Sequence, residues 1–511
     1  MELKINREVI ELRETIYNGA QEQSVELDYV LPDYYPEIFR ILQTRTEPKI
    51  LSQQINGTTL SYELCVTVEV LYCGEAGMNA VQCLRQKLSY RKTVDLGRSC
   101  EDAVITLCPK ADYINCRAVN PRRIDLRGAV STRIHITGQQ SCEAVSDLCG
   151  CHIQTKKIPV EYAAKTTHCS QIVTLSETVE LGSAKPAAQS ILRADAKLIP
   201  GESKVISGKL AAKGEIRVSV LYSCDGQIEP MQFSIPFSKI LDPEGLDESC
   251  TCLLRGEVIS CDITASANND GEARALQCDL SIRLFCTAVH AAHTALVTDA
   301  FSTRHPAGVT TSELILPQLP SPISETGTAQ CVMQSGSPIG QIFDVWCVPR
   351  SIGTRLIAEE GCAEASGMLR FCAMAKAEDG APVFIEQEAP FTHKIQVPEG
   401  CTELEVDAEI SSCTYTMTAN DAVNVQAELC FAGQCSTALR LSSVTDVTID
   451  TTQTLAPSDD CALKLYFGRE GESVWEIAKK YCTAVSAIGE ENELSADVLQ
   501  KDEMLLIPLI G

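Results

Sequence analysis

The feature that most constrains this chain is a strand pattern that recurs three times along it. Apolar and polar residues alternate strictly in three long runs, at 124–136, 276–286 and 423–431. Alternation with a period of two places one set of side chains on a buried face and the other set in water. Antiparallel sheets tolerate such a wet face, whereas all-parallel sheets are covered on both sides. The pattern therefore predicts a mainly β protein built from antiparallel repeats.

Shorter motifs support the same repeat. The sequence V-E-V-L-Y-C at Val68–Cys73 recurs as V-S-V-L-Y-S-C at Val218–Cys224. Asp225-Gly226 and Asp379-Gly380 each lead into a return strand that ends in Pro-Phe. An Asp-Gly pair between two β-rich runs is a strong hairpin signal, because glycine supplies the positive φ of a type I′ turn. We expect three tandem modules, each an antiparallel β-sandwich or open barrel.

The chain of 511 residues is too long for one core, and its length suggests about three or four domains. Polar or proline-rich stretches at 184–189, 316–325 and 442–460 are candidate breaks between them. The predicted organisation is an N-terminal segment with module 1 (1–155), module 2 (156–310), a divergent module 3 (311–441), a linker (442–460) and a C-terminal domain (461–511).

Composition excludes several classes of function. The net charge of −25 argues against a nucleic-acid partner, because a phosphate backbone requires a basic surface. No run approaches the ~18 apolar residues of a membrane span, so no membrane insertion is expected. Residues 1–21 lack the apolar core of a secretory signal, which predicts a cytoplasmic location. There, most of the 26 cysteines are expected to be reduced core thiols. Oxidative crosslinking in an assembled shell and metal ligation are the alternatives.

The segment before the first repeat is aromatic. Residues 28–43 read D-Y-V-L-P-D-Y-Y-P-E-I-F-R-I-L-Q, with Pro36 where a helix could begin. We predict a short helix here. Tyr34, Tyr35 and Phe39 form the densest aromatic cluster of the chain, and they either pack on the first module or form an exposed patch that docks a partner.

The pattern changes after residue 460. Leu463–Phe467 reads as a strand and Met504–Pro508 as another. Between them, Ser473 and Glu476 fit a capping box before a helical apolar face, and Thr483 could cap a second short helix. The C-terminal segment is therefore predicted to be a small β-α-α-β domain.

This segment resembles the LysM family, through G-E-S-V-W-E-I-A-K-K-Y at Gly471–Tyr481 and through Asn492, Leu494 and the final L-I-P. The resemblance implies binding of N-acetylglucosamine polymers, including peptidoglycan, in a groove beside two loops. The implied contact residues are Gly471, Glu472, Ser473, Val474, Asn492 and Leu494. Departures from the family pattern at Glu472, Cys482 and Asp502 shift the expected ligand from a sugar towards a protein.

The front of the chain resembles the SPOCS modules of endospore-forming bacteria, through the D-Y-V-L-P-D-Y-Y-P-E-I run, the V-L-Y strands and the Pro-Phe return strands. SPOCS repeats followed by a LysM domain resemble the spore-coat morphogenetic proteins of clostridia. The resemblance implies a non-enzymatic scaffold or adaptor in the mother-cell cytosol. It would bind the ATPase of the coat's basement layer and tether the coat at the forespore surface. The alternative is a peptidoglycan-binding protein that acts through the LysM-like domain.

No motif predicts catalysis. The chain has no H-E-x-x-H, Walker or G-x-S-x-G pattern. Cys142, Cys149, Cys151 and His152 form a C-x6-C-G-C-H cluster, but a C-x-C-H spacing strains a tetrahedral zinc site, so ordinary thiols are favoured. Cys250 and Cys252 with Cys261 are a weaker metal candidate of the same kind. We therefore expect no enzyme activity, no metal and no cofactor.

Overall fold

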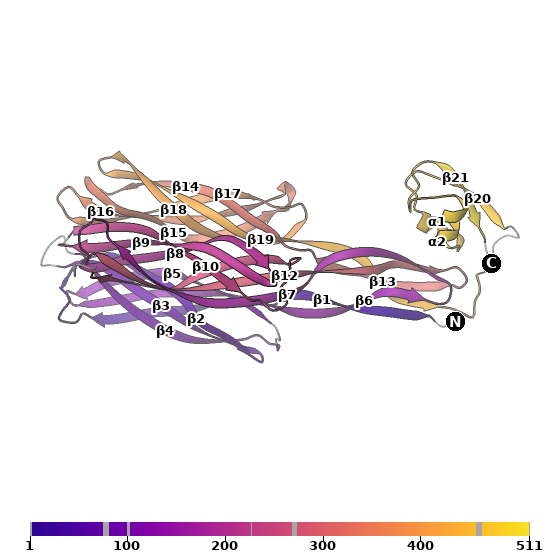
Figure 1. Ribbon diagram of the computed structural model, residues 1–511, viewed down its shortest axis with the longest axis horizontal. Helices are drawn as coiled ribbons and strands as arrows, with labels where there is room; N and C mark the ends of the chain where they lie inside the picture. The colour runs from indigo at the N-terminus through magenta and orange to yellow at the C-terminus, as the bar shows by residue number, and fades with distance from the viewer. Residues whose placement is uncertain are drawn as a thin grey trace.

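A computed structural model describes residues 3–74, 81–99, 103–225, 227–267, 273–455 and 462–509. Antiparallel strands make up most of these residues, which confirms the expectation of a mainly β protein. Figure 1 shows an elongated body that narrows towards the end where both termini lie, with the helical C-terminal domain beside that end.

The strands of the body fall into three successive units. Unit 1 comprises β1 (Lys4–Val30), β2 (Ile38–Asn56), β3 (Thr59–Gly74), β4 (Val81–Asp95), β5 (Val104–Asn120) and β6 (Arg123–Cys149). Unit 2 comprises β7 (Ile153–Glu180), β8 (Ser190–Ile206), β9 (Lys209–Cys224), β10 (Gln227–Leu241), β11 (Thr251–Ser266) and β12 (Ala275–Ser302). Unit 3 comprises β13 (Ala307–Pro317), β14 (Ser321–Gln334), β15 (Ile339–Ile357), a 3₁₀ turn (Ala358–Glu360), β16 (Cys362–Ala377), β17 (Pro382–Gln396), β18 (Cys401–Ala419) and β19 (Ala422–Ile449).

Each unit has two sheets with the same connectivity. Unit 1 forms β2-β3-β4 and β1-β6-β5, and unit 2 forms β8-β9-β10 and β7-β12-β11. In unit 3 the first strand is broken in two, so β19 pairs with β13, β14 and β18 beside the sheet β15-β16-β17. The three alternating runs lie in β6, β12 and β19, and their apolar residues are buried against the other sheet of the same unit. The alternation thus builds three separate cores.

The predicted helix at 28–43 is wrong. β1 continues to Val30 and β2 begins at Ile38, with a turn between them. Two prolines interrupt the run, and the Tyr72 hydroxyl donates a hydrogen bond of 3.1 Å to the Pro36 carbonyl. Unit 2 repeats this contact from Tyr222 to Pro186, at 3.2 Å. The segment between β1 and β2 therefore connects the two sheets of unit 1 without forming a helix.

Two of the expected breaks between domains are also wrong. Residues 184–189 lie inside unit 2, in the crossing between β7 and β8. Residues 442–449 belong to β19, where Ser442, Asp446 and Thr448 face solvent and Ser443 is buried, so this strand end resembles a linker in composition. Gly226 of the predicted Asp225-Gly226 turn lies outside the described residues, but β9 and β10 pair closely around it, with Gln227 opposite Cys224.

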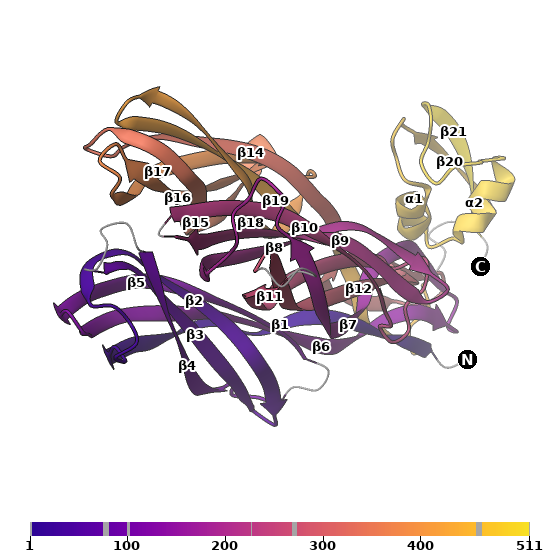
Figure 2. The ribbon, with the colours of Figure 1, turned by 60° about the vertical axis from the view of Figure 1, so that its left-hand side comes forward.

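The three units are joined along a common stalk. The long antiparallel pairs β1/β6, β7/β12 and β13/β19 extend beyond the other strands of their sheets, as Figures 1 and 2 show. A motif V-[ST]-D recurs in β6, β12 and β19, with a β-bulge at its middle residue each time. The valine before each bulge is buried in one cluster that draws on all three units; these residues are Val145, Val297 and Val444. The stalk is therefore a shared core with pseudo-threefold character.

A second shared cluster lies at the wider end of the body. The register of β2, β8 and β15 slips by one residue at Leu42, Leu192 and Phe343. All three skipped side chains pack into the same cluster, together with Trp346 and Leu221. A β-bulge redirects a side chain from its regular face. Here each bulge directs an apolar residue out of its own unit and into the junction.

The C-terminal domain comprises β20 (Leu463–Gly468), α1 (Val474–Tyr481), α2 (Val485–Glu491) and β21 (Glu503–Pro508). Ser473 stands at the N-cap of α1 but its hydroxyl makes no capping bond. Thr483 does not cap α2, which begins after Ala484; its hydroxyl donates to the Pro508 carbonyl instead. The capping roles predicted for Ser473 and Thr483 are thus not realised.

Candidate protein-interaction site

The C-terminal domain docks on unit 2 through one carboxylate. Asp299 of β12 accepts a hydrogen bond of 2.8 Å from the Trp475 indole and pairs with the Lys479 ammonium at 2.7 Å. The Trp475 ring also packs edge-on against Phe301, with 5.0 Å between ring centroids. Partial burial acts to raise the pKa of Asp299, but the hydrogen bonds from Lys479 and Trp475 outweigh it and hold that pKa below its usual value. The docking contact is therefore charge-assisted.

Unit 2 makes this contact, although the V-[ST]-D motif places an aspartate at the same position in every unit. Asp147 pairs with Lys157 at 2.7 Å, and Asp446 lies 3.9 Å from Arg7. The residue two places on is Phe301 in unit 2, whereas the others have a cysteine and a threonine there. The aromatic contact that accompanies docking is thus specific to the second repeat.

The loop residues expected to bind a ligand largely stabilise the domain itself. The Asn492 amide donates to the Ile488 and Leu506 carbonyls and accepts from the Leu506 amide, all within 2.8 Å. The Glu472 carboxylate accepts from the Tyr466 hydroxyl at 3.1 Å. These polar groups are already satisfied within the fold.

The other four predicted loop residues offer few free polar groups. Val474 is buried and Leu494 packs on the same core. Ser473 forms an isolated bridge with Val498, and Gly471 has a φ of 88°, which glycine adopts without strain. No glycan groove with free polar side chains is assembled from these predicted residues.

An apolar sheet face that the sequence analysis did not single out is exposed instead. Leu465 and Phe467 of β20 and Met504 of β21 are 65%, 67% and 64% exposed. Phe467 and Met504 are direct cross-strand partners. The intervening Tyr466 points the other way, towards Tyr481 of α1, so this face lies opposite the helices. We define Leu465, Phe467 and Met504 as the outer β face. The alternation of apolar and polar residues in L-K-L-Y-F is the sequence signal for this face.

In the N-terminal aromatic cluster, two residues are exposed and one packs on the first unit. Tyr34 is 80% exposed and Phe39 is 67% exposed. Tyr35 packs against the core of unit 1, and its burial raises the pKa of its hydroxyl. Tyr34 and Tyr35 contact each other, with ring centroids 4.8 Å apart. Two of the three residues are available at the surface.

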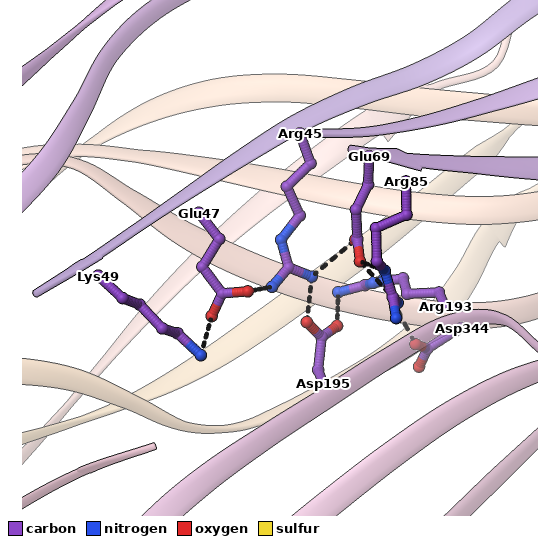
Figure 3. A network of polar contacts seen from close by, with 8 residues as sticks. All are labelled: Arg45, Glu47, Lys49, Glu69, Arg85, Arg193, Asp195 and Asp344. Atoms are coloured by element: carbon purple, nitrogen blue, oxygen red, sulfur yellow. Dashed lines mark hydrogen bonds and ion pairs between the residues drawn. The ribbon is translucent and has the colours of Figure 1, made fainter. Parts of the chain in front are cut away.

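A partly buried polar network joins the three units (Figure 3). Arg45 of unit 1 pairs with Asp195 of unit 2, and Arg193 of unit 2 pairs with both Asp195 and Asp344 of unit 3. The Arg193 guanidinium also lies over the Trp346 ring, 3.5 Å from its centroid. A cavity of about 550 Å³ adjoins the network, and both acidic and basic side chains line it, together with apolar ones. These features indicate a structural junction between units.

The cysteines were expected to be ordinary thiols, with zinc as the weaker alternative for the C-x6-C-G-C-H cluster. Every cysteine among the described residues is a free thiol. Cys142, Cys149, Cys151 and His152 are not brought together as a group of metal ligands. The one group with that geometry in the described part of the chain contains Asp247, Cys250 and His290.

Neither helix described here is long and apolar enough to cross a membrane.

Comparison with known proteins agrees with the resemblance seen in the sequence. Residues 187–266, which include β8 to β11 of unit 2, match the family described as "SipL, SPOCS domain". This match confirms the SPOCS resemblance for that unit. No curated protein and no solved structure matches the chain. The Tyr-to-Pro contact of the matched unit recurs in unit 1, whereas unit 3 has Ala375 at the equivalent position of its central strand, opposite Ile342.

Proposed function

We propose that this protein is a non-enzymatic adaptor in spore-coat assembly. Three SPOCS-type β-sandwich modules would form its rigid body, and a LysM-like domain would bind a protein partner. The family match in unit 2 supports a sporulation-related role in the coat. The two clusters shared among the units support a rigid body, because each unit contributes buried side chains to both.

The observation that carries the binding role is the outer β face. Large exposed apolar side chains that gather on one sheet face are typical of interaction surfaces. Aromatic residues and methionine are also enriched in the centres of protein interfaces. Two of the loop residues that would bind a sugar, Glu472 and Asn492, make hydrogen bonds within the domain instead. The geometry therefore favours a protein ligand for this domain.

The partner we propose is the ATPase of the coat's basement layer, bound on the mother-cell side of the forespore surface. Biolayer interferometry with the purified ATPase and the full chain tests this. We expect saturable binding that Leu465→Ser with Phe467→Ser weakens at least tenfold, because the pair loses a desolvated apolar contact. Ile240→Ser is the matched control, since Ile240 is 64% exposed on β10 of unit 2. Equal binding by both variants would refute the assignment of the face.

Peptidoglycan binding stays a prediction from the family resemblance. Titration of the full chain with muropeptides and with chitin oligomers is the test. Saturable binding that Leu465→Ser with Phe467→Ser leaves unchanged would favour a glycan ligand over a protein ligand.

A further inference from the structure

Three side chains with metal-binding atoms converge in unit 2, beside the loop that joins β10 to β11. Asp247 and Cys250 lie in this loop, and His290 lies on β12. The Cys250 Sγ is 3.3 Å from Asp247 Oδ1 and 3.2 Å from His290 Nδ1. One ligand atom from each residue lies within 4.8 Å of the other two.

The second nitrogen of His290 has a partner of its own. Its Nε2 lies 3.2 Å from the Thr167 hydroxyl on β7. When Nε2–H donates to that hydroxyl, the lone pair of Nδ1 faces Cys250 and Asp247. Metal-bound histidines are held in this way, because the hydrogen bond of the distal nitrogen fixes the tautomer and the ring orientation.

We propose that Asp247, Cys250 and His290 bind a divalent transition metal of the Zn²⁺ class. Thiolate, imidazole and carboxylate are the ligands of protein zinc. Sulfur and nitrogen ligands of one tetrahedral zinc lie about 3.5 Å apart, close to the separation seen here. The thiolate and the carboxylate balance the charge of the ion, and the thiol proton is released to solvent on binding. Water completes the fourth position.

The metal would stabilise the loop that crosses from one sheet of unit 2 to the other. β10 belongs to one sheet of unit 2 and β11 to the other, and the ligand loop connects them. Oδ1 of Asp247 already accepts from the Ser249 amide at 2.8 Å, which shapes the loop before any ion binds. Counted from the V-[ST]-D motif, the residues at the position of His290 are Gly138 and Thr437. The proposed site is thus confined to unit 2, and the proposal departs from the expectation of no metal.

The test uses the full chain, purified without chelator and titrated with Co²⁺. We expect one equivalent to bind with a thiolate-to-cobalt charge-transfer band. Cys250→Ser should abolish the band. Thr167→Val should weaken Co²⁺ binding by about 10–100-fold, because it removes only the hydrogen bond that orients the His290 ring. Cys331→Ser is the matched control, since this half-buried thiol lies on β14 outside any such group. It should leave the band unchanged.

A second measurement keeps the proposal testable if Cys250→Ser does not fold. Zn²⁺ should slow alkylation of Cys250 in the wild-type chain, as followed by peptide mass spectrometry, while the exposed Cys149 reacts at an unchanged rate. Absence of the cobalt band in the wild type, its retention in Cys250→Ser, or unchanged alkylation of Cys250 with Zn²⁺ would each overturn the proposal.

Discussion

The Trp475 indole donates a 2.8 Å hydrogen bond to the Asp299 carboxylate, across the boundary between the C-terminal domain and the second repeat. The chain reaches this domain from β19 of unit 3, yet the domain docks on β12 of unit 2. The docking site coincides with one of three V-[ST]-D bulges. One of the three copies of this structural repeat thus makes a specific contact with the C-terminal domain.

Removal of the Asp299 carboxylate should release the C-terminal domain. A hydrogen bond to a charged group is worth about 1.5–3 kcal/mol, and Asp299→Ala loses the bonds from both Trp475 and Lys479. We expect faster hydrogen–deuterium exchange in α1, with the sheets of unit 2 unchanged. Asp446→Ala is the matched control, because it occupies the same motif position without contacting the domain. Equal exchange in the two variants would show that Asp299 does not hold the domain.

The docking should weaken in acid. The pKa of Asp299 is lowered in the docked state, so its contribution is fully present above the ordinary aspartate pKa of about 3.9. As the pH falls below that value, protonation removes the acceptor charge and the contribution is lost. Exchange in α1 should therefore rise below about pH 4 in the wild type. Asp299→Ala should show no such step, and a step of equal size there would assign it to another group.

The buried network at the junction should be sensitive to the loss of Arg193, whose side chain is only 8% exposed. Burial raises the pKa of Asp344, and Arg193 opposes that effect. Arg193→Met leaves Asp344 buried without its cation, and we expect a loss of about 3–5 kcal/mol in unfolding free energy by urea denaturation.

Arg193→Met with Asp344→Asn should recover part of that loss, because no buried carboxylate then lacks its cation. Arg217→Met is the surface control. Arg217 pairs with Glu215 at half-exposed positions, and its removal should cost less than about 1 kcal/mol. A cost for Arg193→Met as small as the control's would mean that the network does not join the units.

Thiol reactivity should follow burial. Cys278 is fully buried in β12, and burial raises the pKa of its thiol to about 11. Little thiolate is present there at pH 8, and the sulfur is inaccessible. Iodoacetamide should label the exposed Cys149 at pH 8 while Cys278 reacts only after unfolding. Rapid native labelling of Cys278 would contradict the buried core.

The sequence predicted the repeated cores well, because strict alternation fixes which face of a strand is buried. The runs in β6, β12 and β19 are buried on the predicted faces. Residues 28–43 were mistaken for a helix because their apolar spacing also fits a helical turn. Residues 442–449 were mistaken for a linker because one face of β19 is rich in serine and threonine. Composition alone does not distinguish a wet strand face from a solvated linker.

The junction between units could not be predicted in the same way. It depends on bulges at Leu42, Leu192 and Phe343, and these residues look like ordinary strand positions in the sequence. The V-[ST]-D motif recurs three times in the sequence, but only the fold brings its three valines into one cluster. The group of Asp247, Cys250 and His290 joins residues of a loop and a distant strand, so only the pairing of β11 with β12 brings them together.

Localisation in sporulating cells tests the central claim most directly. A fluorescent fusion of the full chain should form a shell at the forespore surface on the mother-cell side. Leu465→Ser with Phe467→Ser should disperse that signal into the mother-cell cytosol, whereas Ile240→Ser should leave it in place. A wild-type fusion that stays diffuse throughout sporulation would contradict the account of this protein as a spore-coat adaptor.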